Sequence, residues 1–503
     1  MKTIPQESIV PRGHSRSSEQ TNSKIQVVSR KLDYFFDPER VFMHFFAHED
    51  YAYWLDSSRV NQNLSRFSFM GSNQGALSHV LSYDTNKKLL SILDKNGQRD
   101  TAISIFDFLD QQLEYLFTKN DNLPFDFNAG YVGYFGYELK AEFGAEIKHI
   151  SEHPDAMFIL ADQLIAFDHE EKCIYLVSLV TPDRIQDAEQ WFDDTESRLQ
   201  TMPEWVPVEF NPESGNEGLE MCWSQTYEEY LESIKLCQHY IKEGETYEVC
   251  LTNQLRIKEK FDPLRTYRIL RKINPAPYSA YFKFNDFNVL SSSPERFLRI
   301  NQDRIVEAKP IKGTIARSND PVIDAQLADE LQSSDKDRAE NLMIVDLLRN
   351  DLGSVCEIGT IKVTKLMDIE SYQTVHQLVS TIEGKLREEL GAIDCIRVAF
   401  PGGSMTGAPK IRTMKYIDEI ESTARGIYSG AIGFLGLNGS TDLNIVIRTL
   451  VLTPEEATLG VGGAVIILSD PEKEYEEILL KSKALIKALS ISKHCSLVPA
   501  RSF

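Results

Sequence analysis

A lysine between a proline and a glycine has the setting in this chain that most suggests chemistry. It is Lys312, in the segment Glu307–Thr314 (EAKPIKGT). Pro310 fixes one backbone dihedral, and Gly313 can adopt conformations that a larger residue cannot. A lysine held on such a turn can face a pocket, where burial lowers its pKa until the neutral amine is a nucleophile. The commoner alternative is a solvated surface charge on a turn.

Carboxylates stand near the starts of two predicted helices. One helix is capped by a residue among 333–335 and runs to Asn350, with Glu340 in its early turns. The other is capped by Asp470, with Pro471 at its first helical position. Both starts carry the residue types that favour helix N-termini.

The second of these helices has Glu474, Glu477 and Lys481 on one face, because their spacing is i, i+3 and i+7. Exposed pairs of this kind stabilise a helix by a few tenths of a kcal/mol. The alternative is a magnesium site, since Mg²⁺ needs few protein carboxylates and fills its other positions with water and substrate oxygens. Spacing alone does not bring Glu340 and Glu477 together, so both interpretations stay open.

Two glycine-rich segments are predicted as loops, Pro401–Lys410 (PGGSMTGAPK) and Gly460–Val465 (GVGGAV). The first lacks the glycine-lysine-hydroxyl ending of a Walker loop, and the second lacks the third glycine of a dinucleotide fingerprint. Each precedes a predicted helix and could offer backbone N–H groups to an anion, either a carboxylate or a phosphate.

The overall charge limits the partners that this chain can bind. Among 503 residues, 54 are basic and 75 acidic, which gives a net charge of −21. Nucleic acid and anionic membranes require a basic surface, so we expect neither as a main partner.

No apolar run reaches the roughly 20 residues that span a bilayer. The seven cysteines are scattered without a C-x-x-C pair, which predicts reduced thiols and a cytoplasmic protein.

The composition divides the chain into five segments. They are a polar, disordered tail over 1–24 that could be a transit peptide, a region over 25–200, a proline- and glycine-containing linker or crossover over 201–222, a catalytic region over 223–490, and a tail over 491–503. Strand-like and helix-like runs alternate unevenly, which favours an α+β fold.

A series of motifs resembles the chorismate-utilising enzymes, which include anthranilate, aminodeoxychorismate, isochorismate and salicylate synthases. In order, the motifs are SSSPERF (291–297), PIKGT (310–314), AENLMIVDLLRNDLG (339–353), VHQLVST (375–381), FPGGSMTGAPK (400–410), RGIYSGAIGF (425–434), DLNIVIRTL (442–450) and GGAVIILSDPEKEYEEILLKSKAL (462–485). The resemblance covers about residues 30–490. It implies a sandwich of antiparallel sheets packed face to face with helices outside, in which the 25–200 region contributes strands.

The resemblance also implies roles for individual residues. Lys312 matches a nucleophile that attacks ring carbon 2 of chorismate, and Glu295 matches a general acid. Glu340 and Glu477, with Glu474 nearby, match ligands of a Mg²⁺ cofactor. The positions matching chorismate contacts are Gly313, Thr314, Ser404, Tyr428, Arg448, Gly462, Gly463, Ala464 and Lys481. Some members hold an amino acid in a second pocket, here near Ser57, Pro277 and Tyr278, and its function in this chain is open.

Three positions distinguish the branches of this family. Lys312 stands where anthranilate synthases have alanine, and Gln377 stands where they have a histidine implicated in pyruvate loss. Glu248 replaces the lysine that activates water in isochorismate and salicylate synthases. The resemblance therefore favours the branch that converts chorismate and ammonia to 4-amino-4-deoxychorismate for 4-aminobenzoate and folate. The alternatives are the anthranilate synthase branch and a non-catalytic relative that binds chorismate or an amino acid.

The resemblance leaves the source of ammonia to a partner. Glutamine-dependent members draw ammonia from a glutaminase, which needs a cysteine on a nucleophile turn, and none of the seven cysteines has that setting. A separate glutamine amidotransferase subunit is therefore expected, with free ammonia as a weaker substitute.

Overall fold

The computed structural model describes residues 25–58, 65–119, 122–204, 207, 209–211, 218–371 and 375–494. Three predicted features lie wholly or partly outside these residues: the tail over 1–24, positions 205, 206, 208 and 212–217 of the linker, and positions 495–503 of the C-terminal tail.

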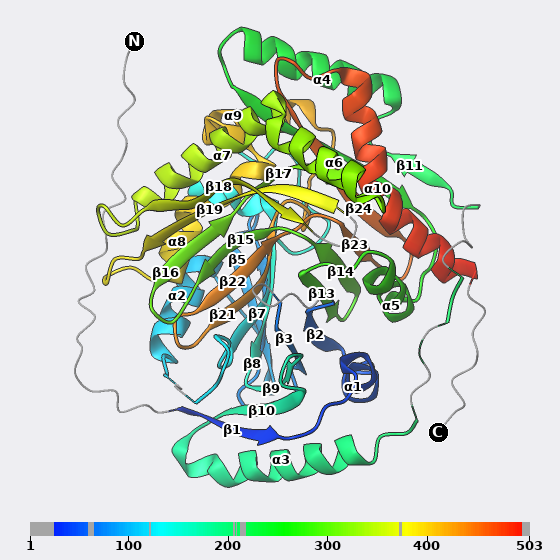
Figure 1. Ribbon diagram of the computed structural model, residues 1–503. Helices are drawn as coiled ribbons and strands as arrows, with labels where there is room; N and C mark the ends of the chain where they lie inside the picture. Colours follow the sequence, from blue (N-terminus) through cyan, green and yellow to red (C-terminus); the bar gives the residue numbers. More distant parts are fainter. Residues whose placement is uncertain are drawn as a thin grey trace.

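Two twelve-stranded sheets pack face to face, and helices cover their outer faces (Figure 1). Where the described residues pair, neighbouring strands run antiparallel, as between β2 and β13 or between β7 and β21. This arrangement confirms the predicted α+β sandwich.

The first sheet contains strands from both ends of the chain. Its order is β1 (Gln26–Leu32), β10 (Cys173–Val180), β9 (Gln163–Asp168), β3 (Phe67–Ser72), β2 (Tyr51–Asp56), β13 (Tyr278–Phe284), β14 (Phe287–Ser293), β23 (Thr449–Leu452), β24 (Ala457–Val465), β12 (Glu248–Ile257) and β11 (Met221–Trp223), with β20 (Gly407–Ala408) paired to β12.

The second sheet is mixed in the same way. Its order is β17 (Ile311–Ala316), β19 (Val375–Lys385), β16 (Ile305–Lys309), β15 (Arg296–Ile300), β22 (Thr441–Ile445), β21 (Ala431–Gly436), β7 (Gly130–Phe135), β8 (Ala156–Ala161), β4 (Val80–Asp84), β5 (Leu89–Asp94) and β6 (Gly97–Thr101), with β18 (Lys362–Ser371) paired to β19.

The helices are amphipathic elements laid on these sheets. They are α1 (Pro38–Phe45), α2 (Ile105–Tyr115), α3 (Ile185–Gln200), α4 (Tyr227–Lys242), α5 (Pro263–Ile273), α6 (Pro321–Ser333), α7 (Asp335–Gly353), α8 (Ala392–Ala399), α9 (Lys410–Ile420) and α10 (Pro471–His494), with short 3₁₀ turns at Tyr137–Phe143, Pro182–Arg184 and Gly403–Met405. Within the described part of the chain, none is both long and apolar enough to cross a bilayer.

Three large apolar cores hold the layers together in the described part of the chain, and a small fourth cluster of Leu331, Met367 and Leu378 lies beside α6. The core between the sheets contains rings from both, such as Tyr53 and Phe282 of the first sheet and Tyr134 and Phe434 of the second. The second core lies between the first sheet and helices that include α4, α5 and α10. The third lies between the second sheet and α2, α7 and α8. Because both regions of the chain supply strands to both sheets, they share these cores; the division into 25–200 and 223–490 stays a prediction.

Three local predictions differ from the structure. Residues 307–314 are not a turn but parts of β16 and β17, two strands that flank Pro310 and both pair with β19. Residues 460–465 are not a loop but the end of β24, because they pair with β12. Helix α10 continues to His494, past the predicted start of the tail at 491, because Leu489 and Ile491 are fully buried.

The junction of the two regions yields a stability prediction at Gly133. This residue lies in β7 opposite Gly433 of β21, and a Cβ added there would lie 1.9 Å from the Met157 carbonyl oxygen of β8. We expect Gly133→Ala to reduce the free energy of unfolding by about 2 kcal/mol or more, because the strands would have to separate. Urea unfolding measures the change.

The matched control is Gly353→Ala at the end of α7, where the nearest atom to an added Cβ is 3.7 Å away. This variant should change stability by no more than about 0.5 kcal/mol. Equal stability of the Gly133 variant and the parent would contradict the proposed close packing.

Candidate active site

A β-bulge in β17 sets the direction of Lys312. Ile311 pairs with Val379 and Thr314 with Gln377, so β17 has one more residue than β19 between these two pairs. Gly313 supplies the extra residue with φ +83°, and a Cβ there would approach Asp337 Oδ1 to 2.8 Å. Lys312 is only 8% exposed, so the alternative of a solvated turn lysine is wrong.

The Lys312 ammonium is buried between two carboxylates from other elements. Its Nζ lies 2.8 Å from Glu248 Oε1 of β12 and 3.9 Å from Glu340 Oε2 of α7. Burial lowers the pKa of Lys312, but the two acidic neighbours outweigh burial and raise it above its usual value. The expectation of a lowered pKa is therefore wrong, because the two carboxylates that face Lys312 come from β12 and α7, outside its own strand.

Glu295 lies beside this lysine, immediately before β15. Its Oε1 is 3.5 Å from the backbone N of Ile311, and its side chain is buried. Burial raises the pKa of Glu295 to about 7, while the Lys312 charge and the Ser404 hydroxyl each lower it in part. A carboxyl with this pKa is partly protonated near neutral pH and can donate a proton.

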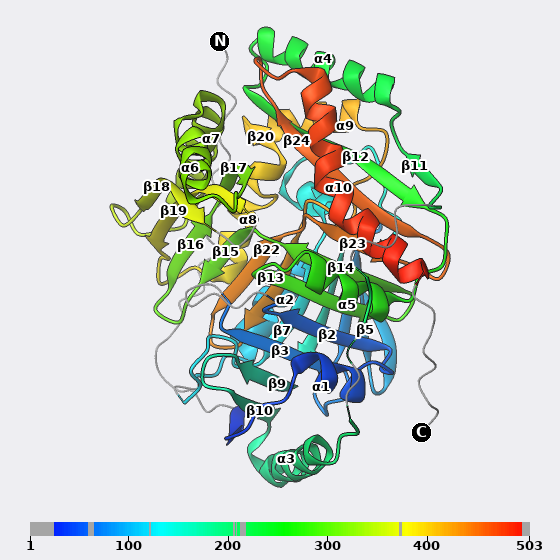
Figure 2. The ribbon, with the colours of Figure 1, turned by 45° about the vertical axis from the view of Figure 1, so that its right-hand side comes forward.

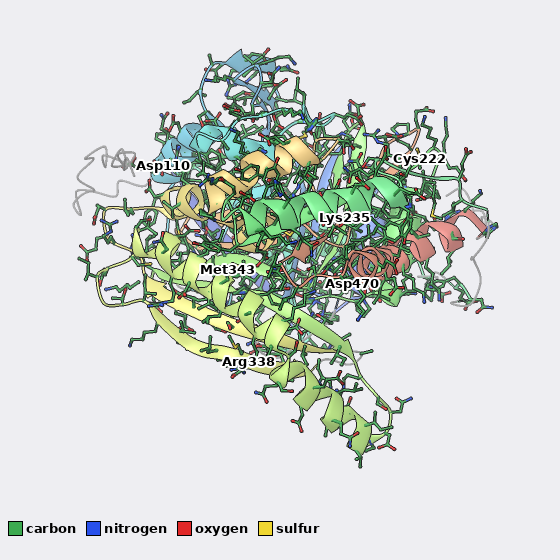
Figure 3. The ribbon with its side chains drawn as sticks, turned by 90° about the horizontal axis from the view of Figure 1, so that it is seen from above. Asp110, Cys222, Lys235, Arg338, Met343 and Asp470 are labelled. Carbon is green, nitrogen blue, oxygen red and sulfur yellow. The ribbon has the colours of Figure 1, made fainter. Side chains whose placement is uncertain are left out.

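Helices α7 and α10 bring their carboxylates to the same place from opposite sides. Ser334 caps α7 and Asp470 caps α10 through backbone N–H groups, as predicted. Lys336 in the first turn of α7 then lies 2.8 Å from Glu474 Oε1 of α10 and 3.9 Å from Glu340 Oε1. Figure 3 shows this upper face, with Met343 on α7 and Asp470 at the start of α10.

Glycines in β24 let the acidic face of α10 approach the strand. A Cβ added at Gly463 would lie 3.2 Å from Glu474 Oε2 and 3.5 Å from Glu477 Oε1. Lys481 Nζ bonds to Glu477 Oε1 at 2.6 Å and to the Gly462 carbonyl at 2.8 Å. Because the N–H and C=O of one residue point to the same side of an antiparallel strand, the Gly462 N–H also faces away from β12, as does that of Ala464.

The carboxylates of this region fit a hard divalent cation. Glu340 Oε1 and Glu474 Oε2 are buried and accept no hydrogen bond. Oxygen donors of this kind are the ligands that Mg²⁺ takes in proteins. The carboxylate oxygens of Glu340, Glu474 and Glu477 do not all lie within 4.8 Å of one another. Among the described residues, only Asp168, Glu171 and Cys173 have potential metal ligands that close together, and there Arg66 already neutralises Asp168.

Tyr428 and Arg448 extend the site along β24. The Tyr428 ring lies against Gly460, where a Cβ would come within 2.3 Å of it. Arg448 has a left-handed backbone (φ +52°), and burial lowers its pKa. No carboxylate in the described part of the chain forms an ion pair with this guanidinium, so it can bind a substrate carboxylate through two hydrogen bonds.

Gln377, and not His376, faces the site. The Gln377 amide Nε2 lies 3.5 Å from Thr314 Oγ1. Successive strand residues point to opposite faces, and His376 contacts Ser371 Oγ at 2.8 Å and Asp324 Oδ1 at 3.0 Å on the other side. The histidine one place earlier therefore does not substitute for the one missing at 377.

Sequence reasoning missed three residues that shape the site. Glu248 stands directly before the apolar run Val249–Leu251, and a charge next to a buried run indicates a buried partner. Lys336 could also be found from the sequence, because it lies four residues, about one helical turn, before Glu340. Glu138 accepts hydrogen bonds from the backbone N–H groups of Arg425 and Gly426, both at 2.9 Å, and so fixes the segment that leads to Tyr428; no signal in the sequence marked it.

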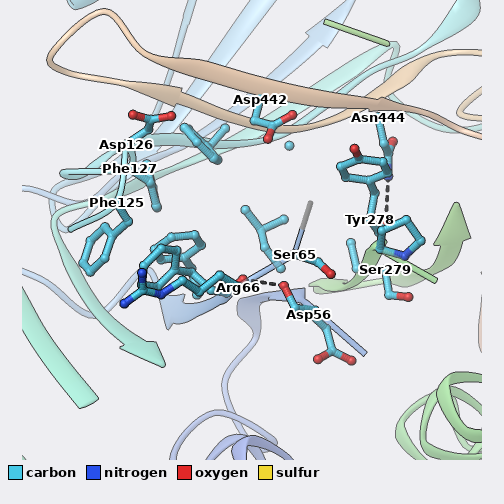
Figure 4. Close-up of a pocket in the computed structure, with 18 of the residues that line it drawn as sticks. Asp56, Ser65, Arg66, Phe125, Asp126, Phe127, Tyr278, Ser279, Asp442 and Asn444 are labelled. Carbon is cyan, nitrogen blue, oxygen red and sulfur yellow. Dashed lines mark hydrogen bonds between the residues drawn. The ribbon is translucent and has the colours of Figure 1, made fainter. Parts of the chain in front are cut away.

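A separate cavity of about 330 Å³ lies between the two sheets and includes Ser57, Pro277 and Tyr278 in its lining (Figure 4). Its three arginines are already paired: Arg299 with Asp126 at 2.7 Å, Arg296 with Asp442 at 3.0 Å and Arg66 with Asp168 at 2.5 Å. Arg296 follows Glu295 directly, so the two sites meet at the start of β15.

Residues 51–487 match the model of the chorismate binding enzyme family. An aminodeoxychorismate synthase of Streptomyces pristinaespiralis is 46% identical over 90% of this chain and 64% of its own length. Anthranilate synthase component 1 of Pseudomonas putida is 33% identical over 90% of this chain and 92% of its own length.

The fold has a solved counterpart. The crystal structure of anthranilate synthase component I from Streptococcus pneumoniae superposes with a TM-score of 0.72 at 28% identity, covering 85% of this chain and 94% of that one. The chain spans about half to two thirds of the length of four aminodeoxychorismate synthases that it matches. The motif series, the sandwich and the family match over 51–487 agree, and this chain belongs to the chorismate binding enzyme family.

Proposed function

We propose that this chain catalyses the aminodeoxychorismate synthase reaction, in which ammonia replaces the 4-hydroxyl of chorismate to give 4-amino-4-deoxychorismate for 4-aminobenzoate and folate synthesis. The observation that carries the proposal is the buried Lys312, 2.8 Å from Glu248 and beside Glu295. The relatives support this branch, since an aminodeoxychorismate synthase is 46% identical and an anthranilate synthase 33%.

The residues divide the reaction into two displacements. Lys312 Nζ bonds to ring carbon 2 of chorismate, the double bonds shift, and the carbon 4–oxygen bond breaks as Glu295 donates a proton to the leaving hydroxyl. Ammonia then bonds to carbon 4, the double bonds return, and the bond from carbon 2 to Lys312 breaks. This scheme needs a neutral amine at the start.

Glu248 is the group that can make Lys312 neutral. It already accepts a hydrogen bond from Nζ, and its second oxygen is buried without a partner. Transfer of the ammonium proton to Glu248 would leave the neutral amine that the scheme needs next to a neutral acid. Because its acidic neighbours raise the pKa of Lys312, this transfer costs free energy that substrate binding would have to supply.

Substrate binding would fall to local cations and backbone groups. Arg448 and the N–H groups of Gly462 and Ala464 suit one carboxylate of chorismate, while Gly313, Thr314, Ser404, Tyr428 and Lys481 complete the predicted set. Glu340, Glu474 and Glu477 would hold Mg²⁺, which when bound supplies positive charge to the ring carboxylate.

Two further proposals concern ligands supplied from outside. Ammonia would come from a separate glutamine amidotransferase, because the cysteines of the described residues, apart from Cys222, are buried, and burial raises the pKa of Cys356 to about 11.

The cavity at Ser57, Pro277 and Tyr278 would bind an amino-acid effector, since its aromatic rings and preformed ion pairs suit a zwitterion.

The product identifies the branch. We expect the purified chain with chorismate, Mg²⁺ and ammonium to form 4-amino-4-deoxychorismate, detected by mass spectrometry, and glutamine alone to yield none. Fluorescent anthranilate formed without an added lyase would contradict the proposal, and so would the absence of any chorismate consumption.

Two variants distinguish the proposed role of Lys312 as a nucleophile from the contribution of its charge to stability. Lys312→Arg keeps the cation between Glu248 and Glu340 but is not a nucleophile, so we expect amination to fall by about 100-fold or more with the fold retained. Lys312→Ala should also lose stability, by about 3–5 kcal/mol, because it leaves a buried carboxylate unpaired. Steady-state kinetics and circular dichroism measure the two effects.

Lys309→Arg is the matched control, since Lys309 of β16 also forms an ion pair, with Glu370 of β18 at 2.9 Å. It should keep near-parental activity. Amination by Lys312→Arg at the parental rate would remove the nucleophile from the scheme.

The proposed role of Glu295 as the general acid predicts how the reaction depends on pH. A general acid must be protonated, so kcat/KM should fall as pH rises through about 7, the value to which burial raises the pKa of Glu295. Glu295→Gln cannot donate this proton and should lose activity at every pH. A profile that stays flat between pH 6 and 9 in the parent would argue against Glu295 as the acid.

A further inference from the structure

An ammonium group of the protein lies where the proposed metal ligands approach each other. Lys336 Nζ contacts Glu474 Oε1 of α10 at 2.8 Å and lies 3.9 Å from Glu340 Oε1 of its own helix, α7. The side chains of the two glutamates are 3% and 8% exposed, whereas that of Lys336 is 39% exposed. The carboxylates are therefore fixed inside the protein while the cation between them can reach water.

This contact joins two parts of the site that have no strand pairing with each other. Helix α7 packs on β17 and β19 of the second sheet, and α10 packs on β24 of the first (Figure 2). The Lys336–Glu474 ion pair crosses between them, as does the Lys312–Glu248 pair. Lys336 is thus a staple between α7 and α10.

The pairing leaves the glutamates incompletely satisfied. Glu340 Oε1 and Glu474 Oε2 are buried and accept no hydrogen bond, although Lys336 stands next to both residues. One ammonium supplies a single positive charge on a flexible stem, while two carboxylates can neutralise a divalent cation and coordinate it directly. A divalent ion therefore matches the charge of this pair better than Lys336 does.

We propose that Lys336 is an internal competitor for the divalent cation: it holds Glu340 and Glu474 together in the metal-free protein and moves into solvent when Mg²⁺ binds. The inference rests on the metal-binding role proposed above for these glutamates, and it does not depend on which product the enzyme forms. Because the two cations exclude each other, the ion pair weakens metal binding by the free energy needed to break it.

Metal binding by the purified chain without substrate tests this competition. Titration with Mn²⁺, followed by the paramagnetic resonance of the free ion, and calorimetry with Mg²⁺ give the dissociation constants. We expect Lys336→Met to tighten binding by about fivefold or more, the lower end of typical coupling between sites. We expect Lys336→Arg, which keeps the charge and can bond a carboxylate twice, to weaken it.

Thermal unfolding gives a second readout that is independent of activity. Lys336→Met should lower Tm in EDTA, because the staple between α7 and α10 is lost, and the gain in Tm on adding Mg²⁺ should exceed that of the parent. The control Lys473→Met removes an equal charge from the exposed side of the same turn of α10 and should shift neither value beyond a small screened effect.

The outcomes separate the competing explanations. Glu340→Gln should abolish tight Mn²⁺ binding in both the parent and the Lys336→Met background. Unchanged or weaker metal affinity in Lys336→Met would overturn the proposal, as would the absence of Mn²⁺ binding by parent and variant alike. If binding tightens as expected while the amination assay fails, the inference stands and the proposed reaction does not.

Discussion

The structure of this site depends on one buried charge, the ammonium of Lys312. Burying an isolated charge costs several kcal/mol, so Lys312 is stable in its place only because Glu248 and Glu340 face it. Glu248 belongs to the first sheet, Lys312 to the second, and Glu340 to a helix that packs on the second. The same interaction therefore positions the Lys312 amine and links the ends of the two sheets to each other. The Lys336–Glu474 ion pair links α7 to α10 in the same way.

Positive charge is concentrated in the site although the chain as a whole is acidic. The net charge is −21, yet the site contains Lys312, Lys336, Lys481 and Arg448. Three of these cations are neutralised by glutamates, and only the guanidinium of Arg448 lacks an ion pair among the described residues. A carboxylate could therefore bind there without displacing a protein partner, whereas a metal ion at Glu474 would have to displace Lys336.

Several features of the site followed from local sequence alone. The caps at Ser334 and Asp470 were predictable because a capping side chain bonds to N–H groups two or three residues away. The shared face of Glu474 and Lys481 followed from helical spacing. Residues 460–465 were mispredicted as a loop because glycines usually interrupt strands, and only the pairing with β12 and the Tyr428 ring explain why small residues are required there.

The sequence by itself determined the family and the sandwich of antiparallel sheets, and it named the candidate site residues, because motif order, residue type and short-range spacing are written in the chain. The tertiary structure decided which charges meet. Lys312 and Glu248 are 64 residues apart in sequence, and Lys336 and Glu474 are 138 apart. The direction of a pKa shift depends on distances in space and on burial, so the raised pKa of Lys312 and the position of Lys336 between two glutamates could be found only after the sheets had been assembled.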